Sequence, residues 1–222
     1  MTGIKETIKA IHSQLPPQTR LVAVSKYHPA EAIMEAYEAG QRIFGESHVQ
    51  ELQRKALELP QDIEWHFIGH LQTNKVKYIA PYVSLIHAVD SERLLAEIDK
   101  QGKRIGRSIP CLLQLHIARE ETKFGFSEEE LISLLENGTH LAYTSVNLCG
   151  LMCMASNVDD EEQIADEFAR AHSLFLTIKD RYFKDNTDFA QCSWGMSDDY
   201  PLAIAHGSTL VRIGSKIFGS RQ

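Results

Sequence analysis

Lys26 is the residue of this sequence whose position most clearly invites chemistry. It ends the apolar run Leu21–Lys26, and Pro29 just beyond it suits the first turn of a helix. A solvated lysine that closes a strand is the common outcome at such a position. A partly desolvated lysine has a lowered amine pKa and can condense with an aldehyde. The position alone leaves both interpretations open.

Two segments near the C-terminus place glycine and serine directly after apolar runs. Gly195 and Ser197 lie in the first segment, and Gly214 and Ser215 lie in the second. Glycine lets the backbone approach a ligand closely, and the free amides of a helix start favour an anion. Two tight turns with serine caps are the alternative. Ser197, Gly214 and Ser215 are therefore candidates for holding a phosphate group.

Arg212 lies between Val211 and Ile213 in the last apolar run. A buried arginine needs an anionic or hydrogen-bonding partner, because burying an unpaired charge is costly. Pairing with a carboxylate is one possibility. The other is that Arg212 donates a hydrogen bond to an acceptor nitrogen of a bound heterocycle.

The elements that must position these residues alternate along the chain. Eight short apolar runs predict strands: Leu21–Lys26, Arg42–Glu46, Trp65–Gly69, Leu85–Val89, Cys111–Ile117, Leu148–Met152, Phe189–Trp194 and Leu210–Ile213. Amphipathic stretches between them predict helices: Pro29–Ala39, His48–Leu59, Ser91–Lys103, Glu128–Glu136 and Asp159–Tyr182. An additional helix is expected at the N-terminus, and Ser91 and Ser127 are expected to cap the helices that they precede.

Strand–helix alternation favours parallel strands joined by right-handed crossovers. Eight units predict an α/β fold made of a single (β/α)8 barrel that spans residues 1–222 as one domain; an open doubly wound sheet is the main rival. A barrel places functional groups at the C-terminal ends of its strands and often binds phosphate after the last two. Lys26 follows the first run, and the two glycine–serine segments follow the last two. The barrel therefore predicts that these residues share one mouth.

Composition limits the classes of partner. The 222 residues are 43% hydrophobic and 24% charged, with a formal net charge of −7. This charge argues against binding of nucleic acid or an anionic membrane surface, although a local phosphate site remains compatible with it. No targeting segment or long apolar run is visible, so the cytoplasm is the expected location.

Other residues that could do chemistry have simpler explanations. Cys111, Cys149, Cys153 and Cys192 are expected to be free buried thiols, with Cys149 and Cys153 on one face of a strand. The pair His66 and His70 could suggest a metal site, but a structural or polar-pocket role is favoured. Glu120, Glu121 and Lys123 could form a loop ion pair or a solvated loop. No nucleotide-binding glycine motif occurs, and no metal is expected.

Several longer motifs together resemble one known family, the pyridoxal phosphate homeostasis proteins. They are Ala-Val-Ser-Lys (23–26), Phe-Gly-Glu (44–46), Val-Gln-Glu (49–51), Trp-His-Phe-Ile-Gly-His-Leu-Gln-Thr-Asn-Lys (65–75), Lys-Phe-Gly (123–125), Gly-Leu-Met (150–152), Gly-Met-Ser-Asp-Asp (195–199) and Val-Arg-Ile-Gly (211–214). The motifs cover nearly the whole chain, and their combination is highly specific. The sequence departs from the common pattern at Ser47, where many relatives have asparagine.

The resemblance implies a barrel like the N-terminal domain of alanine racemase, with pyridoxal 5′-phosphate as cofactor. It implies that Lys26 carries the cofactor as a Schiff base (an internal aldimine), and that Arg212 faces the ring nitrogen. It also implies that Ser197, Gly214 and Ser215 hold the phosphate. A cytoplasmic monomer is implied, with no established reaction and a link to pyridoxal phosphate supply.

The expected function is therefore to hold pyridoxal phosphate reversibly on Lys26, with possible transient transfer to enzymes that use it. An arginine beside the ring nitrogen favours the unprotonated ring, which weakens the cofactor as an electron sink. An amino-acid racemase is the alternative, and it needs a second acid/base on the other face of the cofactor. In alanine racemases a C-terminal domain of the partner subunit supplies that group, and no such domain is expected here. A Schiff-base aldolase is a weaker third possibility.

Overall fold

The protein is a closed barrel of parallel strands, seen here in a computed structural model that describes residues 3–118 and 124–219. Neighbouring strands pair in chain order, and β8 closes the barrel onto β1. The strands are β1 (Arg20–Val24), β2 (Ile43–Glu46), β3 (Glu64–Phe67), β4 (Val83–Val89), β5 (Ile109–Gln114), β6 (Val146–Met152), β7 (Gln191–Ser193) and β8 (Leu210–Ile213). The predicted (β/α)8 barrel is confirmed, and the open doubly wound sheet is excluded.

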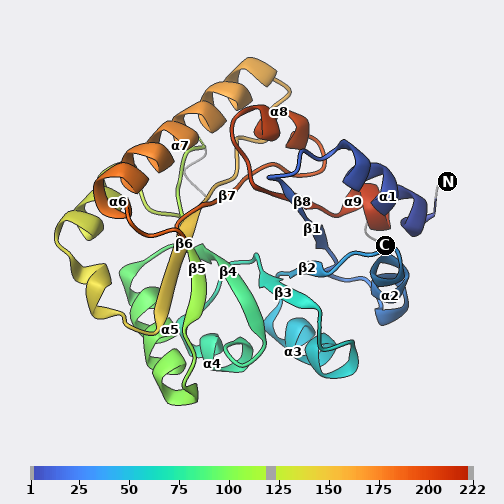
Figure 1. The fold of residues 1–222 in the computed structure, drawn as a ribbon, viewed down its shortest axis with the longest axis horizontal. Helices are drawn as coiled ribbons and strands as arrows, with labels where there is room; N and C mark the ends of the chain where they lie inside the picture. Colours follow the sequence, from blue (N-terminus) through green and yellow to red (C-terminus); the bar gives the residue numbers. More distant parts are fainter. Residues whose placement is uncertain (1–2, 119–123, 220–222) are drawn as a thin grey trace.

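Helices surround the strands (Figure 1). They are α1 (Ile4–Gln14), α2 (Ala30–Glu38), α3 (Val49–Glu58), α4 (Val76–Ile79), α5 (Glu92–Ile105), α6 (Glu128–Glu136), α7 (Glu161–Tyr182), α8 (Tyr200–Ala205) and α9 (Ser215–Phe218), with 3-10 turns η1 (Thr73–Lys75) and η2 (Thr139–Ala142). The extra N-terminal helix is confirmed as α1, which buries Ile8 and Ile11. Within the part of the chain that the structure describes, no helix combines the length and apolar character needed to cross a membrane.

Local signals explain where the helices begin. The Ser91 hydroxyl accepts a hydrogen bond from the Leu94 amide at the start of α5. Ser127 and Glu130 form a reciprocal capping box at the start of α6. Both predicted caps are therefore confirmed. The one-turn helix α4 has no comparable periodic signal, because four residues are too few to display an amphipathic repeat.

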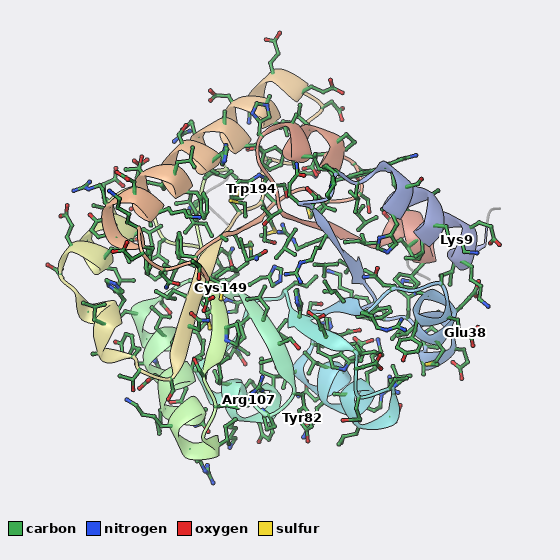
Figure 2. The ribbon with its side chains drawn as sticks, viewed as in Figure 1. Lys9, Glu38, Tyr82, Arg107, Cys149 and Trp194 are labelled. Carbon is green, nitrogen blue, oxygen red and sulfur yellow. The ribbon has the colours of Figure 1, made fainter. Side chains whose placement is uncertain are left out.

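Two apolar cores follow from the alternation of side chains along each strand. The outer core fills the space between strands and helices. The inner core lies inside the barrel and contains Val22, Ile43, Leu85, Ala88, Leu112, Cys149, Met152 and Leu210. Figure 2 shows Cys149 among the central strands, with Tyr82 and Arg107 toward the periphery. Inward positions above this inner core carry the polar side chains of the site.

All four cysteines are free and buried, as predicted. The expectation that Cys149 and Cys153 share a face is wrong, because Cys149 belongs to the inner core and Cys153 to the outer one. The register of β5 against β6 shifts at Cys149, which breaks the simple alternation. Gly150 follows with φ +146°, and a Cβ there would collide with the carbonyl oxygen of Gln191. The bulge thus requires glycine and sends the following side chains to the other side.

Candidate cofactor site

A cavity of about 280 Å3 opens at the mouth formed by the C-terminal ends of the strands. Its lining comes from β1 and β8 and from the segments that follow β1, β3, β6, β7 and β8: Val24, Lys26, His28, Ile68, Met154, Met196, Ser197, Asp198, Arg212, Gly214, Ser215 and Gly219. The structure brings all five predicted site residues to this one cavity. The volume lies near the lower end of the range for small-ligand pockets, which starts at about 300 Å3.

Lys26 lies in the turn just beyond β1 and is half-buried. Strand β1 ends at Val24, so Lys26 is two residues past the strand rather than its last residue. Val22 belongs to the inner core, and both Val24 and Lys26 line the cavity. Tyr27 follows with φ +68°, a left-handed conformation that is uncommon for a bulky residue.

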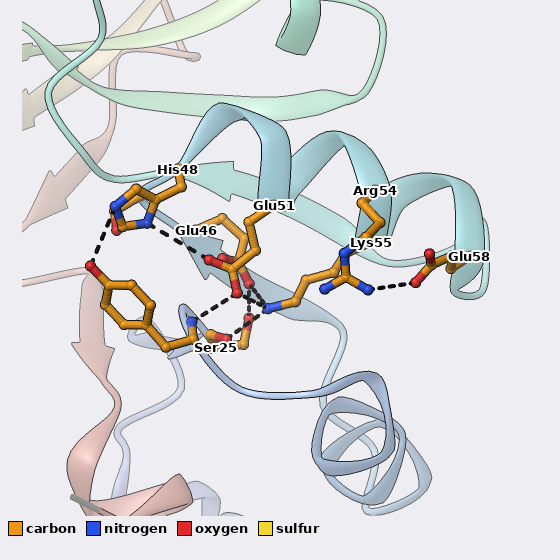
Figure 3. A network of polar contacts seen from close by, with 9 residues as sticks. Ser25, Glu46, His48, Glu51, Arg54, Lys55 and Glu58 are labelled. Carbon is orange, nitrogen blue, oxygen red and sulfur yellow. Dashed lines mark hydrogen bonds and ion pairs between the residues drawn. The ribbon is translucent and has the colours of Figure 1, made fainter. Parts of the chain in front are cut away.

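A polar network around the buried pair Glu46 and Lys55 (Figure 3) fixes the backbone on both sides of Lys26. The Lys55 ammonium donates to the Ser25 carbonyl oxygen at 2.8 Å, on the N-terminal side. On the C-terminal side, the Tyr27 amide donates to Glu51 Oε1 at 2.8 Å. Lys55 also donates to that same Glu51 oxygen at 2.7 Å. Helix α3 therefore holds the turn that presents Lys26, which accounts for the left-handed Tyr27.

The charged centre of this network is the pair Glu46 and Lys55, whose side chains are both completely buried. Lys55 Nζ lies 2.8 Å from Glu46 Oε1, and the Ser25 hydroxyl donates to the same oxygen at 2.6 Å. Within the described residues, the other oxygen, Glu46 Oε2, is buried without a hydrogen-bond partner. Burial raises the pKa of Glu46 to about 7, although the Lys55 charge opposes the rise.

Arg212 reaches the cavity from inside the barrel and is 5% exposed. One terminal nitrogen, Nη1, donates to the carbonyl and hydroxyl oxygens of Ser193 at 2.7 and 2.6 Å. The other, Nη2, donates to the carbonyl oxygen of Cys153 at 3.0 Å. No carboxylate forms an ion pair with Arg212 among residues 3–118 and 124–219, so the carboxylate interpretation is wrong. Burial lowers the pKa of Arg212, and its remaining donors can serve a ligand.

Ser197, Gly214 and Ser215 lie together at one end of the cavity. The Gly214 amide donates to the Ser197 hydroxyl at 3.3 Å, which joins the loops after β7 and β8. A Cβ at Gly214 would lie 3.1 Å from the Val24 carbonyl oxygen, so the loop passes close to the end of β1. Ser197 is buried, whereas Ser215 is exposed at the start of α9. This arrangement offers backbone amides and hydroxyls to an anion.

The sequence reasoning did not include His28 among the site residues, although it is only two residues from Lys26. His28 lines the cavity and stacks on Phe218, with 4.9 Å between ring centroids. Burial, followed by the Lys55 charge, lowers the pKa of His28. Glu46 and Lys55 were also missed as a pair. One sequence feature could have revealed this pair: Lys55 lies among the apolar residues on the face of α3 that packs against the strands.

Other predicted residues lie elsewhere. His66 is buried on β3 and bonds His87, whereas His70 is half-exposed and bonds Asp90, so they do not converge. No cluster of three or more metal-ligating side chains exists among the residues described. The Ser47 hydroxyl contacts His48 rather than lining the cavity. Glu120, Glu121 and Lys123 lie outside the described residues.

Comparisons with known proteins agree with this geometry. The family described as alanine racemase, N-terminal domain, matches residues 2–222. The pyridoxal phosphate homeostasis protein of Vibrio alginolyticus is 36% identical over 100% of this chain and 99% of its own length. The protein of the same name from Aquifex aeolicus is 37% identical over 91% of this chain and 87% of its own.

Solved structures extend the comparison to the fold. PipY of Synechococcus elongatus with pyridoxal phosphate bound superposes with a TM-score of 0.88 at 36% identity, over 97% of this chain and 100% of that one. Alanine racemase from Bartonella henselae superposes with a TM-score of 0.74 at 16% identity, over 98% of this chain but 58% of that one, which shows a common fold. The chain therefore belongs to the alanine racemase N-terminal domain family and, within it, to the pyridoxal phosphate homeostasis proteins.

Proposed function

We propose that this protein binds pyridoxal 5′-phosphate and holds it for intracellular use. The observation that carries the proposal is one cavity that combines a half-buried lysine with a buried arginine lacking a carboxylate partner among the described residues. The lysine amine is a nucleophile suited to the cofactor aldehyde, and the arginine offers donors to an acceptor atom. The relative PipY, which has been solved with pyridoxal phosphate bound, supports the choice of ligand.

We assign Lys26 as the amine that joins the cofactor aldehyde as a Schiff base, with release of one water. Arg212 would face the ring nitrogen, and Ser197, Gly214 and Ser215 would hold the phosphate. Arg212 and Gly214 are two positions apart, with Ile213 between them, and a rise of about 6.6 Å for two extended residues sets the two groups apart along one wall. The guanidinium has donors beyond those that bond Ser193 and Cys153, and a heterocyclic nitrogen beside it would accept from one of them.

A holding role fits these residues better than a reaction. When bound, pyridoxal phosphate supplies an electron sink whose strength depends on protonation of its ring nitrogen. An arginine at that position keeps the ring unprotonated, which favours reversible storage over electron-sink chemistry. The curated relatives are named for homeostasis of the cofactor, which supports the same conclusion. We therefore propose that the protein is not an enzyme.

We further propose that residues 1–222 act as one cofactor-binding domain and that the protein is a cytoplasmic monomer. Four free buried cysteines fit a reducing compartment. The cofactor would pass transiently to enzymes that require it.

Covalent mapping tests the assignment. Purified protein is incubated with pyridoxal phosphate, reduced with borohydride and digested for mass spectrometry. We expect one phosphopyridoxyl group on Lys26 and none in Lys26→Ala. The control is Lys216→Ala, which removes an exposed lysine next to the proposed phosphate site and should leave labelling unchanged. Labelling of a different lysine in the unaltered protein would refute the role of Lys26, and absence of binding would refute the proposed function.

A further inference from the structure

A continuous chain of hydrogen bonds runs down the barrel interior from Arg212. Arg212 Nη1 lies 2.6 Å from the Ser193 hydroxyl, which lies 2.8 Å from His87 Nδ1. His87 Nε2 lies 2.9 Å from His66 Nδ1. These residues come from β8, β7, β4 and β3, and each is at most 5% exposed. The chain therefore crosses the middle of the barrel rather than following one strand.

The direction of every bond follows from the residue at the upper end. A guanidinium only donates, so the Ser193 oxygen accepts from Arg212 and keeps one proton to give away. The described residues offer this proton no acceptor except His87 Nδ1, so Ser193 donates to that nitrogen. His87 therefore carries its proton on Nε2 and donates to His66. His66 accepts at Nδ1 and carries its own proton on Nε2.

Electrostatics supports neutral rings at both histidines. Burial, followed by the Arg20 charge, lowers the pKa of His66 to about 3. Burial, His66, Arg212 and Arg20 all lower the pKa of His87. A proton added to His66 Nδ1 would face the Nε2 proton of His87, and a proton added to His87 Nδ1 would take away the acceptor of the Ser193 hydroxyl proton. The direction of each hydrogen bond in this chain therefore stays the same across the physiological pH range.

The lower end opens at the opposite mouth of the barrel. His66 lines a cavity of about 370 Å3. The cavity is framed by residues at or near the N-terminal ends of the strands: Arg20, Glu64, Ser84, Leu85, Pro110, Asn147, Cys149, Thr187, Asp188, Ala190 and Gln191. His66 Nε2 is not among the buried polar atoms without a partner, and no protein acceptor for it is seen in the described part of the chain. Its proton can therefore be satisfied from this cavity.

We propose that Ser193, His87 and His66 are positioning residues that orient Arg212 toward the cofactor. The proposal rests on the proposed function, because Arg212 matters through the ligand that it faces. The Ser193 hydroxyl accepts from the guanidinium while it donates its own proton to His87 Nδ1. His66 keeps His87 in the required tautomer. These three residues do not contact the ligand, but they set the direction of the Arg212 donors that contact it.

The first test needs no cofactor. Nitrogen NMR of histidine-labelled protein should show His66 and His87 as neutral rings protonated on Nε2, unchanged across roughly pH 6–8. In Ser193→Ala the signal of His87 should change, because Nδ1 has lost its donor. A charged ring, or a proton on Nδ1 of either histidine, would overturn the proposed chain whatever the protein binds.

The second test uses the cofactor-loaded protein and a matched pair of variants. His87→Gln keeps an acceptor and a donor, whereas His87→Leu keeps neither. We expect His87→Leu to bind pyridoxal phosphate about tenfold more weakly, which is the effect of losing one charge-assisted hydrogen bond. We also expect the visible absorption of the bound cofactor to change at a different pH than in the unaltered protein. His87→Gln should stay within about twofold of the unaltered protein.

The outcomes separate the two proposals. If both variants fold with similar melting temperatures and bind equally well, the positioning role is wrong. If His87→Leu does not fold, Ser193→Ala takes its place in the binding measurement, with the same expected loss. If the unaltered protein binds no pyridoxal phosphate, the proposed function fails together with the positioning role, while the NMR measurement still decides the order of the hydrogen bonds.

Discussion

The buried carboxyl of Glu46 makes a quantitative prediction about stability and pH. Its pKa rises from 4.5 to about 7 on folding, because burial outweighs the attraction of Lys55. A raised carboxyl pKa means that the folded protein binds a proton that the unfolded chain has lost. The free energy of unfolding therefore falls as pH rises from about 4.5 to about 7. At about 1.4 kcal/mol per pKa unit, this fall amounts to about 3 kcal/mol.

Glu46→Gln removes the titrating group while keeping its shape. The amide oxygen can still accept from Ser25 and Lys55, and Lys55 retains Glu51 as an ion-pair partner. The difference in unfolding free energy between the unaltered protein and this variant should therefore shift by up to about 3 kcal/mol over the same pH range. The shift should favour the variant as pH rises.

Urea denaturation at several pH values measures this difference directly. Glu58→Gln is the control, since Glu58 is half-exposed on the same helix and should give a difference that is independent of pH. A pH-independent difference for Glu46→Gln, or one that favours the unaltered protein as pH rises, would refute the assignment of the raised pKa to Glu46.

Three further outcomes are expected. Gly214→Ala should weaken binding of pyridoxal phosphate at least fivefold in an absorbance titration, because a Cβ 3.1 Å from the Val24 carbonyl would push the loop outward; unchanged affinity would contradict the close approach. Glu51→Gln, which weakens the anchor of the Tyr27 amide, should slow labelling of Lys26 several-fold in a timed reduction assay; an equal rate would show that the anchor is dispensable. Ser127→Ala should lower the unfolding free energy by about 1 kcal/mol without affecting cofactor binding, through loss of the cap of α6; calorimetry and the same titration check both parts.

Much of the fold could be predicted from the sequence, because the sequence patterns that indicate strands and helices are local. The run Leu210–Ile213 matches β8 at both ends, and Glu128–Glu136 matches α6 at both ends. Strand β7 proved shorter than the run Phe189–Trp194, since only three of its residues pair with neighbours. Apolar character marks a buried segment, whereas the ends of a strand depend on where its neighbours stop.

Part of the site could be predicted from the sequence for the same reason. Lys26, Ser197 and Gly214 follow strands, and a barrel gathers such residues at one mouth. The partners of Arg212 could not be foreseen, because the choice between a carboxylate and neutral oxygens is made by residues that meet only in three dimensions. Likewise, His66 and His87 belong to different strands, and nothing in the spacing of either predicts that they touch. The face of Cys153 escaped prediction because one bulge reverses the alternation.

The anchoring of the turn around Lys26 has a consequence for how a ligand is captured and released. Both peptide groups that flank this lysine form hydrogen bonds to side chains of α3, one to the buried Lys55 and one to the partly buried Glu51, so its backbone is already ordered in the folded protein. Capture then needs to order only the four-carbon side chain, a preorganised arrangement that favours affinity. Release needs no backbone opening for the same reason. This arrangement allows a ligand to bind and leave while the backbone around Lys26 keeps its conformation.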